Sequence, residues 1–150
     1  MIDERTALKN AIDKRAPDII NLVNDFANQH FDVITRTRDG KRQFTELVEA
    51  AAQTCCINEF KLYIKYKGAK EGTRSLWGNL ANPFNAKIDS LVETVADDIV
   101  KKDKTDDIVK KDKADETEKD NEAVRIEVLK RFCGYLMWRV HADISMRGGR

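Results

Sequence analysis

The residues with the clearest chemical potential are cations gathered in the stretch TRTRDGKR. Four of them fall within seven positions: Arg36, Arg38, Lys41 and Arg42. We expect a helix to begin here, so that the side-chain cations and the backbone N–H groups of its first turn can both point at a phosphate group. Such a cluster indicates electrostatic contact with a nucleic-acid backbone, which carries one negative charge per phosphate.

A second group of cations follows on the next predicted helix, where it occupies two neighbouring rows: Lys61 and Lys65, then Lys67, Lys70 and Arg74 if the helix extends that far. Tyr63 and Tyr66 interleave with these lysines and could stack on bases. In the alternative interpretation Tyr63 belongs to the core and the lysines are ordinary solubilising surface. Composition alone favours this alternative.

Residues that could catalyse a reaction or hold a metal are not arranged for either task. His30 falls at a predicted helix end and His141 on an apolar helix, and neither has a partner at a spacing typical of a metal or nucleophile motif. Gly68 and Gly72 are expected to end a helix rather than to cradle a phosphate. We therefore expect no enzymatic activity, no cofactor and no metal.

The cysteines and the absence of apolar runs bear on the compartment. Cys55, Cys56 and Cys133 lack zinc-site spacing and are expected to be buried free thiols in a reducing cell. No apolar run approaches the roughly 18 residues of a membrane span. The N-terminal stretch MIDERTALKN is too charged for a signal peptide. These observations predict a cytoplasmic protein with no membrane partner.

Apolar residues recur at helical spacing along most of the chain, which predicts an all-α fold. We expect a single helical-bundle domain over residues 1–150, built of five or six helices, with helices near residues 3–29, 41–54, 60–70, 83–95 and 124–144. Pro17 is expected to start a second helix within the first of these ranges. The stretches HFDVITRTRDG and GTRSLWGNLANP are expected to be connections, the second with Leu76, Trp77 and Leu80 packed inward.

One octapeptide occurs twice before the last predicted helix. DDIVKKDK fills residues 97–104 and returns at 106–113. Nine residues at about 100° each place the copies half a turn out of register, so a continuous helix cannot use both in one apolar stripe. We interpret residues 101–121 as a charged, duplicated and flexible linker, whose extra length costs little. The alternative is a functional acidic motif.

The net charge of +1 conceals an uneven distribution. Residues 33–80 carry nine Lys/Arg against five Asp/Glu, and residues 125–150 carry six against two. Residues 93–122 carry seven against twelve. The helical body is therefore basic. We expect the acidic segment to compete with phosphate, so that deletion of residues 104–113 leaves folding almost unchanged and nucleic-acid affinity level or higher.

Taken in order, three stretches resemble the small helical subunit of type III CRISPR effector complexes, the Csm/Cmr small-subunit family: ITRTRDGKRQFTELVEAA, EFKLYIKYKGAKEG and VLKRFCGYLMWRVHADI. The basic helix start of that family corresponds to Thr35–Phe44, its tyrosine-rich basic helix to Tyr66–Lys70, and the arginine–phenylalanine pair of its final helix to Arg131–Tyr135. The chain departs from the pattern in its duplicated segment and in Lys70, where arginine is commoner.

The resemblance implies a non-catalytic subunit that stacks with copies of itself along an RNA-guided effector filament. Such a subunit bridges the large polymerase-like subunit and the backbone subunits. It contacts the sugar-phosphate backbone of guide RNA and of target RNA or single-stranded DNA, while base pairing reads the sequence. The nucleic-acid-binding residues that we expect are Arg36, Arg38, Lys41, Arg42, Lys61, Lys65, Lys67, Lys70 and Arg131. The alternative is a helical adaptor without a nucleic-acid role, which makes contact through its final helix and the exposed remainder of the Trp77 loop.

Overall fold

The computed structural model describes residues 4–72, 75–106 and 114–148. Within these ranges the fold is all-helical, which confirms the predicted class. The number of helical segments exceeds the five or six expected. Pro17 lies in the first turn of α2, as predicted. The segments are α1 (Glu4–Lys14), α2 (Ala16–Gln29), α3 (Phe31–Arg36), α4 (Gly40–Gln53), α5 (Ile57–Glu71), α6 (Leu76–Leu91), the π-helical η1 (Val92–Ala96), α7 (Asp97–Asp106) and α8 (Ala114–Gly148).

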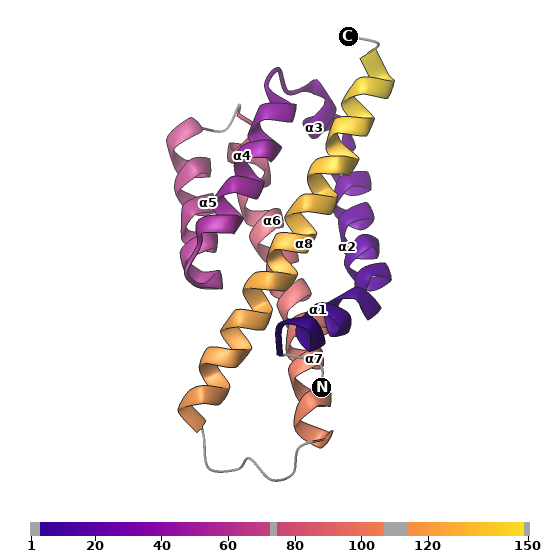
Figure 1. The fold of residues 1–150 in the computed structure, drawn as a ribbon. Coiled ribbons are helices and arrows are strands. Elements are labelled where there is room, and N and C mark those ends of the chain that lie inside the picture. Colours follow the sequence, from indigo (N-terminus) through magenta and orange to yellow (C-terminus); the bar gives the residue numbers. More distant parts are fainter. Residues whose placement is uncertain (1–3, 73–74, 107–113, 149–150) are drawn as a thin grey trace.

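Helix α8 runs the length of the molecule, with α4 and α5 on one side and α2 on the other (Figure 1). Helices α6, η1 and α7 continue one another as a second long rod. At a rise of 1.5 Å per residue, α8 is about 50 Å long. The end of α7 and the start of α8 lie at one end of the molecule, and α3 and the start of α4 lie at the other (Figure 1).

The core is organised around the ring of Phe84, which lies on α6. Its centroid is 5.5 Å from Phe26 of α2, 6.3 Å from Phe60 of α5 and 6.0 Å from Phe132 of α8. All four rings are fully buried. Because aromatic residues from four helices meet at one point, they fix the positions of those helices relative to each other.

Helix α6 begins at Leu76. The predicted start near residue 83, where the pair Asn82-Pro83 is typical of a helix N-terminus, is therefore wrong. The hydroxyl of Ser75 accepts a hydrogen bond from the Gly78 N–H at 2.9 Å and so caps the helix. Leu76, Trp77 and Leu80 are buried, which confirms their predicted inward packing. The stabilisation from the cap and from burial of these side chains exceeds the cost of the backbone hydrogen bond that Pro83 cannot donate inside the helix.

The stretch expected to connect the second and third predicted helices contains α3. Ile34 on this short helix is buried. The hydroxyls of Thr35 and Thr37 donate to the carbonyls of Phe31 and Val33 at 2.8 and 2.7 Å, so they lie back against α3 and do not cap α4. A helix of six residues is too short to produce a recognisable periodic pattern of apolar residues in the sequence.

The first copy of the octapeptide is part of the folded body. Residues 97–104 lie in α7, and Ile99 is buried. The Asp98 carboxylate accepts from Arg15 of α2's N-cap at 2.5 Å, and Asp97 accepts from Arg125 of α8 at 3.0 Å. Residues 101–106 and 114–121 of the predicted linker are helical. The second copy lies outside the described residues beyond Asp106, and the flexibility of the linker stays a prediction.

The cysteines differ from one another in exposure. Cys133 is buried as expected, and burial raises the pKa of its thiol. Cys55 is exposed and Cys56 is half-buried, so the predicted burial is wrong for this pair of free thiols, which lies in the turn between α4 and α5. There Cys56 Sγ accepts a hydrogen bond from the Glu59 N–H at 3.4 Å and caps α5.

Candidate nucleic-acid interface

Four of the predicted cations form one surface where α3 ends and α4 begins. We call Arg36, Arg38, Lys41 and Arg42 the basic corner. Gly40 positions it, because this residue is buried and a Cβ there would lie 2.8 Å from Ile144 Cδ1 of α8 and 3.2 Å from the Ile34 carbonyl oxygen. The missing side chain lets the start of α4 pack directly against α3 and α8.

The side chains of the basic corner are open to solvent. Arg36 and Arg38 are exposed, and neither forms an ion pair or hydrogen bond with any described residue. Lys41 donates to the hydroxyl of Ser145 at 2.7 Å, and Arg42 lies 3.2 Å from Asp39 and 3.8 Å from Glu46. Exposed pairs of this kind contribute only about 0–1 kcal/mol, so a phosphate can replace the carboxylate.

Arg147, near the end of α8, lies beside the basic corner and was not among the residues selected from the sequence. Its guanidinium contacts the hydroxyl of Thr35, lies 3.9 Å from the Asp32 carboxylate and stands 5.7 Å from the centre of the Phe31 ring. All three partners belong to α3. Helix α8 thus places Arg147 next to residues more than 100 positions earlier in the chain, and no local sequence pattern could predict this proximity.

Lys67 has a structural position rather than a surface one. Its side chain is only 13% exposed. The ammonium group donates to Gln43 Oε1 at 3.0 Å and lies over the Tyr63 and Trp77 rings. Gln43 Oε1 also accepts from Trp77 Nε1 at 3.1 Å. This junction ties the last turns of α5 to the first turn of α4, so Lys67 is not a free phosphate contact.

The remaining lysines of α5 divide between two faces. Lys61 pairs with Asp89 of α6 at 2.5 Å. Lys65 and Lys70 are exposed, and Lys70 lies 5.9 Å from the centre of the Tyr66 ring, which is itself 59% exposed. Lys65, Tyr66 and Lys70 therefore point outward from α5. Helix α5 ends at Glu71, followed by Gly72 with φ 81°, and Arg74 lies outside the described residues.

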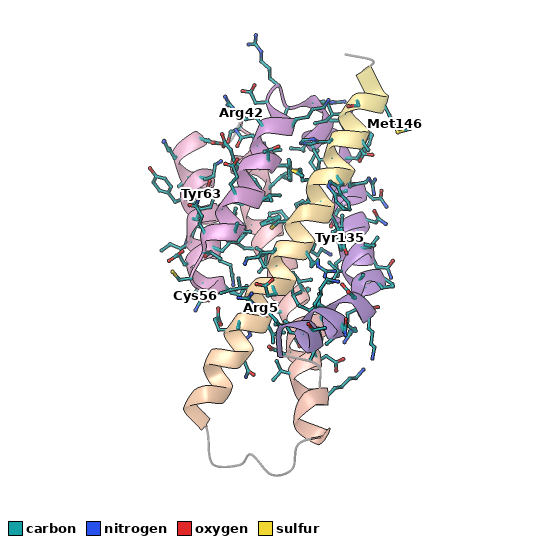
Figure 2. All side chains as sticks on the ribbon, in the orientation of Figure 1. Arg5, Arg42, Cys56, Tyr63, Tyr135 and Met146 are labelled. Carbon is teal, nitrogen blue, oxygen red and sulfur yellow. The ribbon has the colours of Figure 1, made fainter. Side chains whose placement is uncertain are left out.

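Arg131 lies away from the other predicted cations. Its guanidinium donates to Asp13 of α1 at 2.5 Å and to the Tyr135 hydroxyl at 3.4 Å. The hydrogen bond from Arg131 is the main cause of a lowered pKa of Asp13. In Figure 2, Tyr135 lies midway along α8, well below Arg42 at the end of the bundle. The structure thus brings the basic corner together and separates Arg131 from it.

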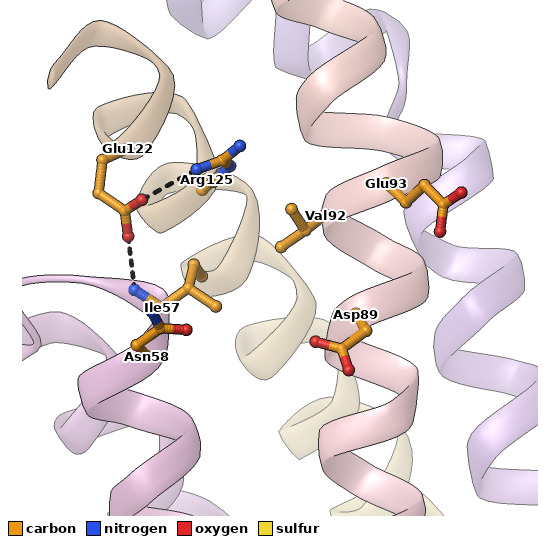
Figure 3. Close-up of a pocket in the computed structure, with 7 residues that line it drawn as sticks. All are labelled: Ile57, Asn58, Asp89, Val92, Glu93, Glu122 and Arg125. Carbon is orange, nitrogen blue, oxygen red and sulfur yellow. Dashed lines mark hydrogen bonds and ion pairs between the residues drawn. The ribbon is translucent and has the colours of Figure 1, made fainter. Parts of the chain in front are cut away.

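A pocket at the other end of the bundle has the opposite charge. It lies between the start of α5, η1 and α8, has a volume of about 190 Å³, and is lined by Ile57, Asn58, Asp89, Val92, Glu93, Glu122 and Arg125 (Figure 3). Glu122 accepts from the Ile57 N–H at 2.6 Å and from Arg125 at 3.2 Å. Its carboxylates would repel a phosphate group, in contrast to the cations of the basic corner.

The two histidines have separate surroundings. His141 Nε2 lies 3.0 Å from the Lys41 carbonyl oxygen and 3.3 Å from the Thr45 hydroxyl, and the His30 ring packs 4.7 Å from Phe26. In the described part of the chain, no three His, Cys, Asp or Glu residues come together in a group that could hold a metal ion. Nor does any helix there combine the length and apolarity needed to cross a membrane.

The fold defines the class as an all-α helical bundle with a basic end. Comparisons with protein-family models, curated proteins and solved structures find no match.

Proposed function

We propose that the protein is a non-catalytic subunit of an RNA-guided complex of the type III CRISPR kind, and that it holds the backbone of guide RNA and target nucleic acid. The observation that carries this proposal is the basic corner, where Arg36 and Arg38 are exposed and have no partner among the described residues. The resemblance described above supplies the assembly: stacked copies of the subunit, the large polymerase-like subunit and the backbone subunits.

The chemistry of the corner suits phosphate rather than bases. Guanidinium groups present donors in a planar fork that matches phosphate oxygens, whereas Lys41 contributes a point charge. Lys65, Tyr66 and Lys70, which are exposed on α5, offer further cations and an aromatic ring for contact with a strand. Contacts of this type position a strand without reading its sequence, as an assembly that accepts any guide requires.

Reversal of three corner charges tests the proposal. The variant Arg36→Glu/Arg38→Glu/Arg42→Glu is expected to bind labelled single-stranded RNA at least about tenfold more weakly, because the affinity of such contacts depends on neutralised phosphates. Fluorescence anisotropy at salt concentrations from about 50 to 200 mM measures the affinity and its salt dependence, both of which should fall in the variant. Lys67 is left unchanged because of its structural contacts.

A matched control carries the same change of charge at the other end of the bundle. Lys9 and Lys14 of α1 and Lys101 of α7 are exposed, and Lys9→Glu/Lys14→Glu/Lys101→Glu should keep most of the wild-type affinity. Circular dichroism should show the same helicity for all three proteins. Equal losses in both variants would show that net charge matters and position does not, and wild-type binding by the corner variant would remove the corner from the interface.

Both contact surfaces expected for the adaptor alternative remain. Trp77 is fully buried, as predicted, and Gly78 and Asn79 beside it are exposed at the start of α6. The final helix is the second surface. Purification of the protein with its native partners distinguishes the two functions, since bound guide RNA supports the proposal and a protein partner without RNA supports the adaptor.

A further inference from the structure

The exposed face of α8 carries a shallow groove beside an exposed tryptophan. Trp138 is 66% exposed, and its ring centroid lies 5.7 Å from that of Tyr135 with an angle of 56° between the planes. The groove has a volume of about 210 Å³ and is lined by Glu127, Lys130, Arg131, Gly134, Tyr135 and Trp138. It contains Arg131, a predicted cation that lies away from the basic corner.

Gly134 leaves the floor of this groove open. It lies one turn before Trp138, and a Cβ at this position would have no neighbouring atom within 4 Å. A flat group can therefore approach the α8 backbone beside the indole ring. Arg131 fixes one wall, since it holds the Tyr135 hydroxyl while its own guanidinium is held by Asp13.

We propose that this groove stacks an unpaired base of a single-stranded nucleic acid, as a second contact distinct from the phosphate contacts at the basic corner. The inference rests on the proposed function. An exposed aromatic pair flanked by cations is the combination with which proteins bind single strands, because every base has a π-face that can stack on it. Lys130 is bound only to Glu127 in an exposed pair at 3.1 Å, which a phosphate can replace.

The position of the groove on α8 links it to the corner. Lys41 of the corner contacts Ser145, two turns and about 10 Å beyond Trp138 on the same side of α8. A strand held at the corner is therefore within reach of the indole. A protein partner is less well matched, because the groove lining contains no aliphatic side chain that would form the apolar centre of a protein interface.

Intrinsic fluorescence provides a direct test. The chain has two tryptophans, and Trp77 is fully buried, so a change caused by a surface ligand reports on Trp138. We expect oligouridylate to quench the fluorescence as it binds. An abasic oligonucleotide of equal length, which offers phosphates without bases, should bind at the corner and leave the fluorescence unchanged.

Substitution of the indole tests the same contact through affinity. Trp138→Ala should weaken oligouridylate binding roughly 5- to 150-fold, the range measured for loss of one stacked base, and leave abasic binding unchanged. Trp138→Phe should keep most of the affinity. Leu62→Ala removes a side chain of equal exposure, 67%, on α5 and should change neither.

The outcomes separate the base site from the proposed function. If oligouridylate binds without quenching, or binds Trp138→Ala as it binds wild type, the base site is overturned and the groove is left for a protein partner. In that case the Arg36/Arg38/Arg42 reversal still decides the corner by its effect on abasic binding. If the wild-type protein binds neither oligonucleotide, the corner and the base site both fail.

Discussion

His30 is a half-buried ionisable side chain with an incomplete hydrogen-bond complement. It occupies the junction of α2 and α3, and no described residue bonds to its buried Nε2 atom. Burial, and secondarily the positive charge of Lys87, lower the pKa of this imidazole below its ordinary value of 6.5. The neutral ring packs against Phe26, and a protonated ring would bring a charge into the same place.

This arrangement predicts a loss of stability in mild acid. Since the pKa is lower in the folded state, the unfolded chain binds the proton first, and the free energy of unfolding should decrease as the pH falls below about 6.5. Urea unfolding at about pH 7.5 and 5.5 should show this decrease in the wild type and a smaller one in His30→Leu. Asp13 and Asp98, whose pKa values are also lowered, lose their contributions only nearer their ordinary value of 3.8 and below. An identical pH dependence in both proteins would contradict the assignment to His30.

The roles of individual cations were only partly predictable from the sequence. The corner residues were identified because they are close in sequence. Lys67 has the same residue type and spacing as its neighbours, but it points at Gln43 and two aromatic rings, and Arg131 points at Asp13. Which lysine or arginine is exposed depends on residues 24 and 118 positions away, and no local pattern contains that information.

The contact between α5 and α6 depends on a glycine. A Cβ at Gly68 would lie 2.7 Å from Ala81 Cβ and 2.9 Å from the Trp77 carbonyl oxygen, both closer than side chains normally approach. The two helices therefore pack backbone to backbone at this point. Gly68 looked from the sequence like a signal for the end of a helix, and it lies within α5.

Gly68→Ala should lower the free energy of unfolding by about 1–2 kcal/mol, because the strain of overpacking exceeds what alanine gains over glycine in a helix. Gly134→Ala is the matched comparison. It is also a glycine within a helix, but nothing lies within 4 Å of its added methyl group, and it should raise stability by up to about 1 kcal/mol. Chemical denaturation of both variants measures the difference, and a stabilising Gly68→Ala would contradict the close approach.

Helix boundaries could be predicted from the sequence where only one start or end signal was present. The class of the fold, the start of α2 at Pro17 and the extent of α4 were predictable from apolar spacing and proline. The start of α6 was not, because the Ser75 cap competes with the more familiar Asn82-Pro83 signal and prevails through the burial of Trp77. Both start signals can be seen in the sequence, but the sequence does not show which of the two helix starts has the lower free energy.

At the scale of the whole molecule, charge is separated between the two ends of the bundle. The basic corner lies at one end, and the end of α7 and the start of α8 lie at the other (Figure 1). About 50 Å of α8 separates them, several times the Debye length of about 8 Å at physiological salt. Each octapeptide also carries three Asp and three Lys, so the repeat itself is neutral.

The deletion of Lys104–Lys113 is therefore expected to leave nucleic-acid affinity level, and the rise considered from the sequence is not expected. Stability should change little, because fourteen residues would remain between the buried Ile99 and Val124. Anisotropy and thermal unfolding of the deleted protein measure the two quantities. A clear loss of both would show that the duplicate is structural, and a large gain in affinity would show that it masks the corner.

The π-helical segment η1 determines where the chain can change length. In this turn the Asp97 N–H bonds to the Val92 carbonyl, five residues back, so η1 holds one residue more than an α-helical path. Loss of one residue here would convert η1 to a regular α-helical turn, so Asp97 and Asp98 would keep roughly their present directions toward the arginines of α8 and α2. A gene encoding this fold can therefore lose a single codon between 92 and 96 and keep α7 on its neighbours, whereas the same loss from the regular part of α6 would rotate α7 by about 100°.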